Sequence, residues 1–398
     1  MLAWLLAAPV SAQGLPSEPI SLAAGRLVVS GDVSGSISSE HDAGYLNAGD
    51  YKHDELRLLR LGLTAAWYPT DRLSVLGRVR TEGWDTIEPY ALFVRVRPWL
   101  TRAFDVNIGR IPPTFGAFSR RSYGKDNPLI GLPLPFHYRT SLQSGAVPAT
   151  ADDLLRVRAL GGGELVRYPI GATTVEQGLP LLDVLRWDTG VQVRAGSRAV
   201  EILAAVTNGS MAHPVVTDDN GGKQVVGRVT FSPSPALVVG VSASRAAYLA
   251  DEVRDALPAG VTGRFTQRAV GVDAEYSRAQ WLVRAEGLVS SWAVPRVEAP
   301  LVDERLQAVG VTVLGRYRVA PAWYIAARLD HLGFSDVTGT RFEGAPTPWD
   351  IPITRLEVGG GYFLRRNVIA KVSFQQNWRD DAFIRPGGFL AAQLLYWF

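Results

Sequence analysis

Apolar and polar or small residues alternate over long stretches of the chain, most clearly between Lys223 and Phe398. The clearest example is Leu306–Arg318, the turn Val319–Ala322 and then Trp323–Phe334. A period of two is the pattern of a strand with one apolar and one polar face. This half of the chain is therefore predicted to be a series of antiparallel hairpins.

The same alternation is found in the N-terminal half, and short connections alternate with long ones throughout. The predicted strands are Arg26–Ile37, Leu56–Tyr68, Leu73–Trp84, Ile87–Arg97, Phe104–Ile111, Arg186–Arg194, Ala199–Thr207, Gln224–Phe231, Leu237–Ala247, Phe265–Tyr276, Trp281–Ser291, Leu306–Arg318, Trp323–Phe334, Leu356–Leu364, Val368–Trp378 and Phe389–Phe398. Many exceed the about 5–6 residues usual in soluble proteins. We predict an all-β, transmembrane antiparallel barrel of about 16 strands, wide enough for an aqueous lumen. The alternative is a secreted soluble β-sandwich.

One long segment, 112–185, breaks the alternation, beginning at Pro112-Pro113. Irregular segments of this length are uncommon and usually functional. Within it, Thr150–Arg156 has the capping residue and the early acids of a short helix. We predict that 112–185 is the third outer loop, folded into the lumen as a constriction. The alternative is a lid outside the barrel.

Aromatic residues lie near many predicted strand ends, as expected for girdles at the two membrane interfaces. They are Trp67, Tyr68, Trp84, Trp99, Trp187, Trp281, Trp323, Tyr362, Trp378, Tyr396 and Trp397. The alternative is ordinary packing within a sheet.

Composition agrees with export. The 398 residues include 40 Gly and no Cys, and no stretch approaches 18 uninterrupted apolar residues. Met1–Ala12 resembles a truncated signal peptide, with Val10-Ser11-Ala12 as the cleavage motif. We therefore expect a signal at 1–12, a periplasmic leader at 13–25 and the barrel at 26–398.

Basic residues are dispersed rather than clustered. The formal net charge is +3, and Lys occurs only at 52, 125, 223 and 371. Dispersed Arg at alternate strand positions argues against nucleic-acid binding and favours a lumen lined with guanidinium groups. The inward set predicted from alternation is Arg60, Arg78, Arg80, Arg95 and Arg97, and Arg110, in the stretch Ile108–Gly116, is added as a pore-lining candidate.

Facing this basic wall, alternation predicts a mixed set of inward charges that includes Arg284, Glu286, Arg328 and Asp330. The long segment adds candidates for the narrowest point of the pore. These are Arg120, Arg121, Lys125, Asp126, Asp152 and Asp153. Charged walls select ions by sign. The alternative is that these charges pair across strands and only keep the lumen wet.

Signals for catalysis, metals or cofactors are weak. The five His residues are scattered, and Glu40-His41-Asp42 and His53-Asp54-Glu55 are more typical of solvated loops than of metal sites. We predict no catalytic residues, no metal and no cofactor. A barrel enzyme is the alternative, and its base would be His331, the only His in a predicted strand.

Several motifs resemble bacterial outer-membrane porins of the phosphate-selective porin O and P type. Ile108–Gly116 is similar to the strand that leads into the constriction loop, Val206–Gly209 to a strand end, and Val226–Val229 with Pro233 to the next hairpin. The terminal Tyr396–Phe398 resembles the signal read by the barrel-assembly machinery.

The resemblance implies a 16-stranded barrel, commonly trimeric, that passes small ions or anions. We therefore predict a porin of the bacterial outer membrane for passive diffusion of small ions and hydrophilic solutes, with weak anion or mixed selectivity. Its expected surroundings are outer-membrane lipid and lipopolysaccharide, with a homotrimer as the assembly. A substrate-specific channel, for phosphate or another anion, is the alternative. With four Lys and mixed charges, no phosphate site is assigned.

Overall fold

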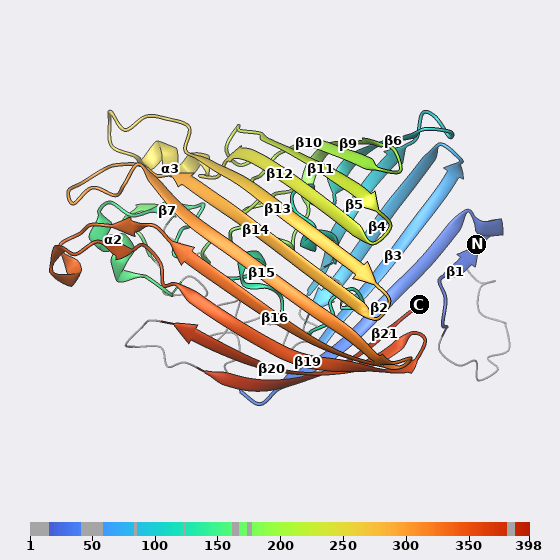
Figure 1. Ribbon diagram of the computed structural model, residues 1–398. Helices are drawn as coiled ribbons and strands as arrows, with labels where there is room; N and C mark the ends of the chain where they lie inside the picture. The colour runs from blue at the N-terminus through green and yellow to red at the C-terminus, as the bar shows by residue number, and fades with distance from the viewer. Residues whose placement is uncertain are drawn as a thin grey trace.

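The computed structural model describes residues 16–40, 59–82, 86–121, 124–160, 167–172, 177–379 and 387–398. Within them, 16 strands form a closed antiparallel barrel (Figure 1). These strands are β2 (Leu27–Ser38), β3 (Leu59–Thr70), β4 (Leu73–Glu82), β5 (Thr86–Val96), β6 (Ala103–Ile111), β9 (Asp188–Gly196), β10 (Val200–Thr207), β11 (Gln224–Ser234), β12 (Leu237–Ala247), β13 (Thr266–Arg278), β14 (Trp281–Ala293), β15 (Arg305–Ala320), β16 (Trp323–Phe334), β19 (Ile353–Arg365), β20 (Val368–Arg379) and β21 (Gly388–Trp397). The predicted fold class is confirmed. The proposed signal, Met1–Ala12, lies outside the described residues.

The barrel closes between its first and last strands. Strand β21 pairs antiparallel with β2, with Ser34 opposite Leu395. The ladder continues to the last residue, because Gly31 and Phe398 exchange main-chain hydrogen bonds of 3.1 and 2.9 Å. A short strand, β1 (Ile20–Leu22), pairs with the end of β2 that β21 leaves uncovered. It is followed by η1 (Ala23–Gly25).

Alternation along the strands separates an apolar outer face from a largely polar inner face. On β15, Val309, Val311 and Val313 are 42%, 41% and 44% exposed, whereas Thr312 and Leu314 are 7% and 6% exposed. Such an outer face suits contact with lipid. Among the described residues, no helix is long and apolar enough to cross a membrane.

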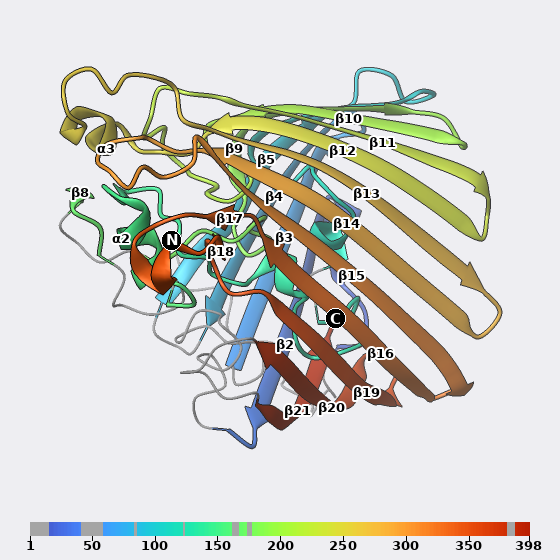
Figure 2. The ribbon, with the colours of Figure 1, turned by 60° about the vertical axis from the view of Figure 1, so that its left-hand side comes forward.

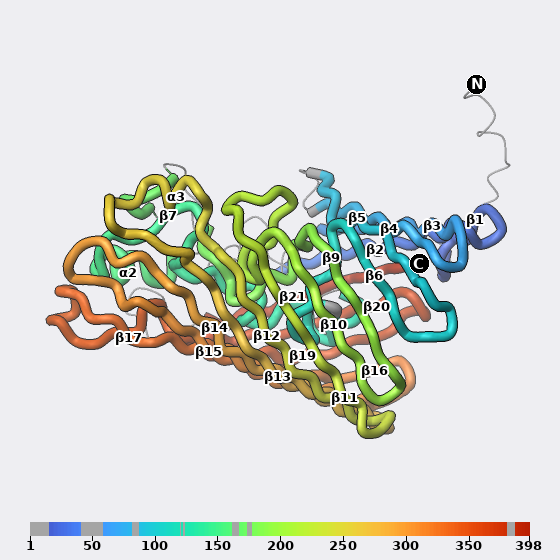
Figure 3. The backbone as a smooth tube through the Cα atoms, turned by 90° about the horizontal axis from the view of Figure 1, so that it is seen from above, coloured from blue at the N-terminus to red at the C-terminus, as the bar shows by residue number. Residues whose placement is uncertain are grey.

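Connections at the two ends of the barrel differ in length. At one end, residues 279–280, 321–322 and 366–367 each join two strands in a two-residue turn. Figures 1 and 3 show β1 and the C-terminus at this end. The long connections gather at the other end with α3 (Asp251–Ala256), β17 (Asp336–Val337), η5 (Arg341–Gly344) and β18 (Thr347–Pro348), as Figure 2 shows. By analogy with barrels of this type, the short turns are periplasmic.

Aromatic pairs lie on the outer face beside the short turns. The rings of Trp281 and Tyr317 are 4.7 Å apart, and those of Trp323 and Tyr362 are 4.4 Å apart. These positions are those of an interfacial girdle. The prediction for Trp187 is wrong, because it lies in the interior at 9% exposure. Trp84 lies outside the described residues.

The long segment between β6 and β9 packs against the inner face of the barrel. It contains η3 (Phe118–Arg121), η4 (Leu134–Phe136), β7 (Ala146–Val147), α2 (Ala151–Arg156) and β8 (Ile170–Gly171). Its Phe115, Phe136 and Tyr138 share an apolar cluster with inward residues of β14 and β16, such as Leu288 and Leu332. The main apolar core therefore lies between this segment and the inner wall of the barrel.

Candidate functional site

The long segment enters the lumen over Glu286 of β14. The Glu286 carboxylate accepts hydrogen bonds from the main-chain N–H groups of Ala117, at 3.1 Å, and Phe118, at 3.0 Å. Gly116 permits this approach, since a Cβ there would lie 2.2 Å from a Glu286 oxygen and its φ is +71°. The carboxylate thus holds the first turn of the segment by its backbone.

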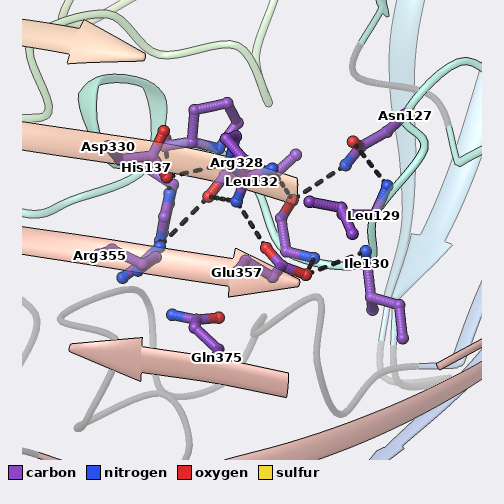
Figure 4. Close-up of polar contacts among 12 residues, drawn as sticks. Asn127, Leu129, Ile130, Leu132, His137, Arg328, Asp330, Arg355, Glu357 and Gln375 are labelled. Atoms are coloured by element: carbon purple, nitrogen blue, oxygen red, sulfur yellow. Dashed lines mark hydrogen bonds and ion pairs between the residues drawn. The ribbon is translucent and has the colours of Figure 1, made fainter. Parts of the chain in front are cut away.

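Glu357 of β19 makes the same kind of contact farther along the segment. It accepts from the N–H groups of Ile130 and Gly131, at 3.2 and 3.0 Å. A Cβ at Gly131 would lie 2.8 Å from Glu357. Figure 4 shows these bonds beside the guanidinium of Arg328. Glu286 and Glu357 therefore each bind two consecutive main-chain N–H groups, at two separate points of the segment.

Arg328 of β16 connects the segment to two buried carboxylates. Its guanidinium pairs with Asp330 at 2.9 Å and Glu357 at 2.6 Å, with all three side chains 0% exposed. It also donates to the carbonyl oxygens of Gly131, at 2.8 Å, and Leu132, at 3.0 Å (Figure 4). Arg328 and Asp330 are thus inward, as predicted, but they contact the segment rather than an open lumen.

His137 completes this network from the segment side. Its Nδ1 donates to the Pro133 carbonyl at 2.9 Å, and its Nε2 accepts from Arg355 of β19 at 3.2 Å. Burial and the adjacent Arg355 guanidinium hold the pKa of His137 well below its usual range. The imidazole is therefore neutral in the folded protein.

Asp350 anchors the outer part of the segment. This buried carboxylate accepts from the Tyr138 hydroxyl at 3.1 Å and from the N–H groups of Ser141 and Ala159, at 2.8 and 2.9 Å. Residues 138–159 are thereby attached to the connection that precedes β19. Sequence reasoning did not find Asp350, because a single acid in a loop carries no pattern.

Asp152 and Asp153, predicted to line the pore, form hydrogen bonds within the long segment and to the connection that contains Thr340. Asp153 forms a capping box with Thr150 at the start of α2. Asp152 accepts from the N–H groups of Thr340 and Arg341, at 2.8 and 3.0 Å. The hydrogen bond donated by the Thr340 hydroxyl, together with these N–H bonds, lowers the pKa of the Asp152 carboxyl. Neither residue lines the two cavities described below.

The other end of the segment is attached to the β4–β5 wall. A register shift in the β4–β5 ladder turns Tyr90 inward, to 3% exposure, where its hydroxyl donates to Val184 O at 3.1 Å. Arg80 lies 4.3 Å from the Tyr90 ring centre and donates to Leu185 O at 3.1 Å. Alternation alone predicts that Tyr90 points outward with Leu92. The register shift turns it inward instead.

Open space remains beside strands β2 to β5. A chamber of about 790 Å³ lies against their inner face and against the Gly124–Asp126 turn of the segment. Its periplasmic end is lined by Ser17–Pro19 and by Arg366 and Asn367. A narrower cavity of about 30 Å³ adjoins it. The residues that the two cavities share include Asp32, Arg78, Gly124 and Leu395.

Basic side chains dominate the barrel wall of these two cavities. Arg60, Arg78 and Arg80 line the narrow one, and Arg78 and Arg95 line the chamber. Arg78 pairs with Asp32 at 2.6 Å. Arg95 bonds only to Asn107, at 3.3 Å, and no described carboxylate lies within ion-pair distance of it.

The segment presents Lys125 and Asp126 to the chamber. Lys125 is exposed, and no described residue forms an ion pair with it. Arg121 pairs with Glu275 at 2.7 Å, and Glu275 also binds Arg284 at 2.8 Å. Arg121 and Arg284 thus form a mixed-charge cluster at the edge of the segment.

Three predicted positions lie elsewhere. Arg97 is exposed at the periplasmic rim and pairs with Asp105 at 2.9 Å. Arg110 shares a face with the outward Leu92, because Asp105, Asn107, Gly109 and Ile111 take the inward positions of β6. Its guanidinium donates to Trp187 O at 2.9 Å and to Pro89 O. The side chain of Arg120 lies outside the described residues, as do His41 and His53.

Lys371 of β20 was missed as a site residue. Its Nζ donates to the carbonyl of Asn127 at 2.7 Å, and Lys371 is 2% exposed. Alternation with Ser373, Gln375 and Asn377 marks it as inward. This alternation is visible in the sequence, so Lys371 could have been predicted as an inward residue. Among the described residues, no group of three or more His, Asp or Glu side chains could hold a metal ion.

A closed 16-stranded antiparallel barrel with an apolar outer face and a long third loop packed inside defines the porin type of barrel. The closed barrel and its apolar face place the chain in the bacterial outer membrane. No protein-family model matches the sequence, and no curated protein matches it.

Solved structures of outer-membrane proteins share this fold. An outer membrane protein of Vibrio cholerae, OmpT, is 11% identical with a TM-score of 0.56, over 95% of this chain and 99% of that chain. OmpF of Salmonella typhi, solved with daunomycin, is 14% identical with a TM-score of 0.54, over 94% and 97%. The outer membrane channel DcaP of Acinetobacter baumannii is 12% identical with a TM-score of 0.54, over 96% and 100%. At these identities the likeness establishes the fold.

Proposed function

We propose that this protein is a porin, a water-filled channel for passive diffusion of small ions and hydrophilic solutes, with a weak preference for anions. The observation that carries the proposal is the position of the open space. Both cavities lie against the Arg-bearing wall of β3 to β5. The charges of β14 to β19, in contrast, bind the long segment. A solute therefore meets mainly cationic side chains, which favour anions.

The proposal is tested by reconstituting the purified protein in planar bilayers. We expect stepwise conductance and a reversal potential in a KCl gradient of the sign set by chloride. Arg95→Gln should move the reversal potential toward the cation side, because it removes an unpaired charge from the chamber. Arg156→Gln is the matched control, since Arg156 is an exposed residue of α2 that lines neither cavity. Absence of conductance, or strong cation selectivity, contradicts the proposal.

A more specific proposal than a general preference for anions is selectivity for phosphate, as in porins of the O and P type. The chamber contains Arg78, Arg95 and Lys125 together with Asp32 and Asp126, a mixture that supports a general preference for anions more than a dedicated phosphate site. Chloride current that falls at low phosphate concentration would favour the selective form. Chloride current unaffected by phosphate would leave the general porin.

A substrate-specific channel plugged by its own loop is the second candidate. The observation that favours it is the attachment of the segment to two opposite walls, at Tyr90 and at Glu357. Deletion of residues 120–180 should raise the conductance if the segment constricts the pore. A barrel enzyme has less support, because His331 lies on the outer face with the outward Val311.

The assembly and its partners are proposed on the same grounds. We expect a homotrimer surrounded by outer-membrane lipid and lipopolysaccharide, inserted by the barrel-assembly machinery through the strand that ends at Phe398. The support is the exposed apolar outer wall and the pairing of Phe398 with Gly31 at the closing seam. Cross-linking in native membranes would test the number of subunits.

A further inference from the structure

Residues 124–132 of the long segment form turns and bends that lie against the inner wall of the barrel. Side chains of the barrel donate hydrogen bonds to its carbonyl oxygens. Arg284 donates to Asp126 O at 3.0 Å and Tyr324 to Pro128 O at 2.8 Å. The negative ends of these carbonyl dipoles are therefore directed toward the β14–β20 wall and away from the chamber.

Lys371 is central to this arrangement. Its Nζ donates to the carbonyls of Gly124 and Asn127, the latter at 2.7 Å, and lies 3.5 Å from Leu129 O. No described carboxylate lies within ion-pair distance of it. A buried ammonium whose partners are only carbonyls is costly to desolvate. An apolar side chain would avoid this cost but would leave three carbonyls without their donor.

The turn that Lys371 holds forms one side of the chamber. Gly124 packs against Leu395 of β21, since a Cβ added there would lie 3.2 Å from the Leu395 side chain. Lys125 and Asp126, the next two residues, line the chamber opposite Arg78 and Arg95. The position of this turn therefore determines both the width of the passage and the charges that face it.

We propose that Lys371 is the positioning residue of the pore, the donor that fixes the Gly124–Asp126 turn in the corner between β20 and β21. The inference rests on the proposed channel function. Without the Lys371 ammonium, the turn leaves its corner, and its carbonyl oxygens join Asp126 in facing the solute. The charge preference of the passage then shifts toward cations, although the substituted position itself is buried.

The test uses the full-length protein with Lys371→Met, Lys371→Arg and Lys125→Met, each recorded in planar bilayers in a KCl gradient. We expect Lys371→Met to change the open-channel conductance and to move the reversal potential toward the cation side. Lys371→Arg should keep the conductance and the reversal potential at their wild-type values, because a guanidinium also donates to carbonyls. Lys125→Met removes one charge from the chamber without removing a donor, so it should shift the reversal potential while the turn stays in place.

A chemical readout separates movement of the turn from loss of charge. The chain has no Cys, so Lys125→Cys gives a single reporter thiol. Its reaction rate with a water-soluble thiol reagent should change when Lys371→Met is added and should not change with Lys371→Arg. Tyr324→Phe, which removes only the Pro128 contact, gives a second and milder test if Lys371→Met does not fold.

Wild-type conductance and reversal potential in Lys371→Met, with an unchanged thiol rate, would overturn the inference and leave the channel function standing. Absence of conductance in the wild type would instead overturn the proposed function.

Discussion

At Arg328 one guanidinium binds two carboxylates and two main-chain carbonyls where the side chains are fully buried. Each partner depends on the others, because a buried charge without its counter-charge is strongly destabilising. The inward charges of this wall are therefore structural. Their alternation in the sequence correctly indicates their direction, but it does not indicate what covers them.

Arg328→Met should lower the free energy of unfolding by about 3–5 kcal/mol, because it removes the guanidinium that pairs with the buried Asp330 and Glu357 carboxylates. Urea titration of the barrel in lipid vesicles measures this loss. Arg366→Met is the matched control, since the side chains of its pair with Glu18 are 81% and 65% exposed, and it should cost less than about 1 kcal/mol. Equal losses in the two variants would show that the Arg328 network is not a specific anchor.

His137 should make stability depend on pH. Its pKa is lowered in the folded protein by burial and by Arg355, whereas the unfolded chain has the ordinary value of about 6.5. Below about 6.5 the unfolded state binds more protons, so stability falls as the pH falls, by up to about 1.4 kcal/mol per pH unit.

Urea midpoints at several pH values between 7.5 and 5 measure the effect of His137. The His137→Gln variant should lose this part of the dependence, because Gln does not titrate there. An identical pH profile in the variant would assign the dependence to other groups.

At the scale of elements, the short helix α2 shows that acids of the long segment can be remote from the passage. Thr150→Ala should lower the local stability of α2 by about 1 kcal/mol, because it removes the side-chain cap. Hydrogen exchange at residues 151–156 measures this change. The reversal potential of Thr150→Ala should stay at the wild-type value. A shift in the reversal potential would indicate that Asp152 and Asp153 line the pore.

Local patterns predicted the strands well, because a period of two reports directly which side of a strand is apolar. They failed where a neighbour decides the outcome. Tyr90 turns inward through a register shift with β4, and Trp187 is buried against it, with ring centres 5.2 Å apart. The role of Glu286 depends on a main-chain contact with residues more than 160 positions away. No local pattern encodes such a contact.

For the whole molecule, the central point is that the long segment divides the inner surface into two parts. One part, on β14 to β20, binds the backbone of the segment and is shielded from solvent. The other, on β2 to β5, binds only the end of the segment, through Arg80 and Tyr90, and lines the open cavities with Arg side chains. On the proposed channel function, the cavities left open by the segment would form a passage with more basic than acidic side chains.

Cys substitutions at two inward-facing serines test this division directly. Ser30 of β2 lines the chamber. Ser373 of β20 is 2% exposed, paired with Ala391, which packs on Ile130 of the segment. In the Cys-free chain, each is replaced singly by Cys and treated with a water-soluble thiol reagent during channel recording. Ser30→Cys should react and its current should fall, whereas Ser373→Cys should not react. Equal reaction and equal block at the two positions would contradict the account.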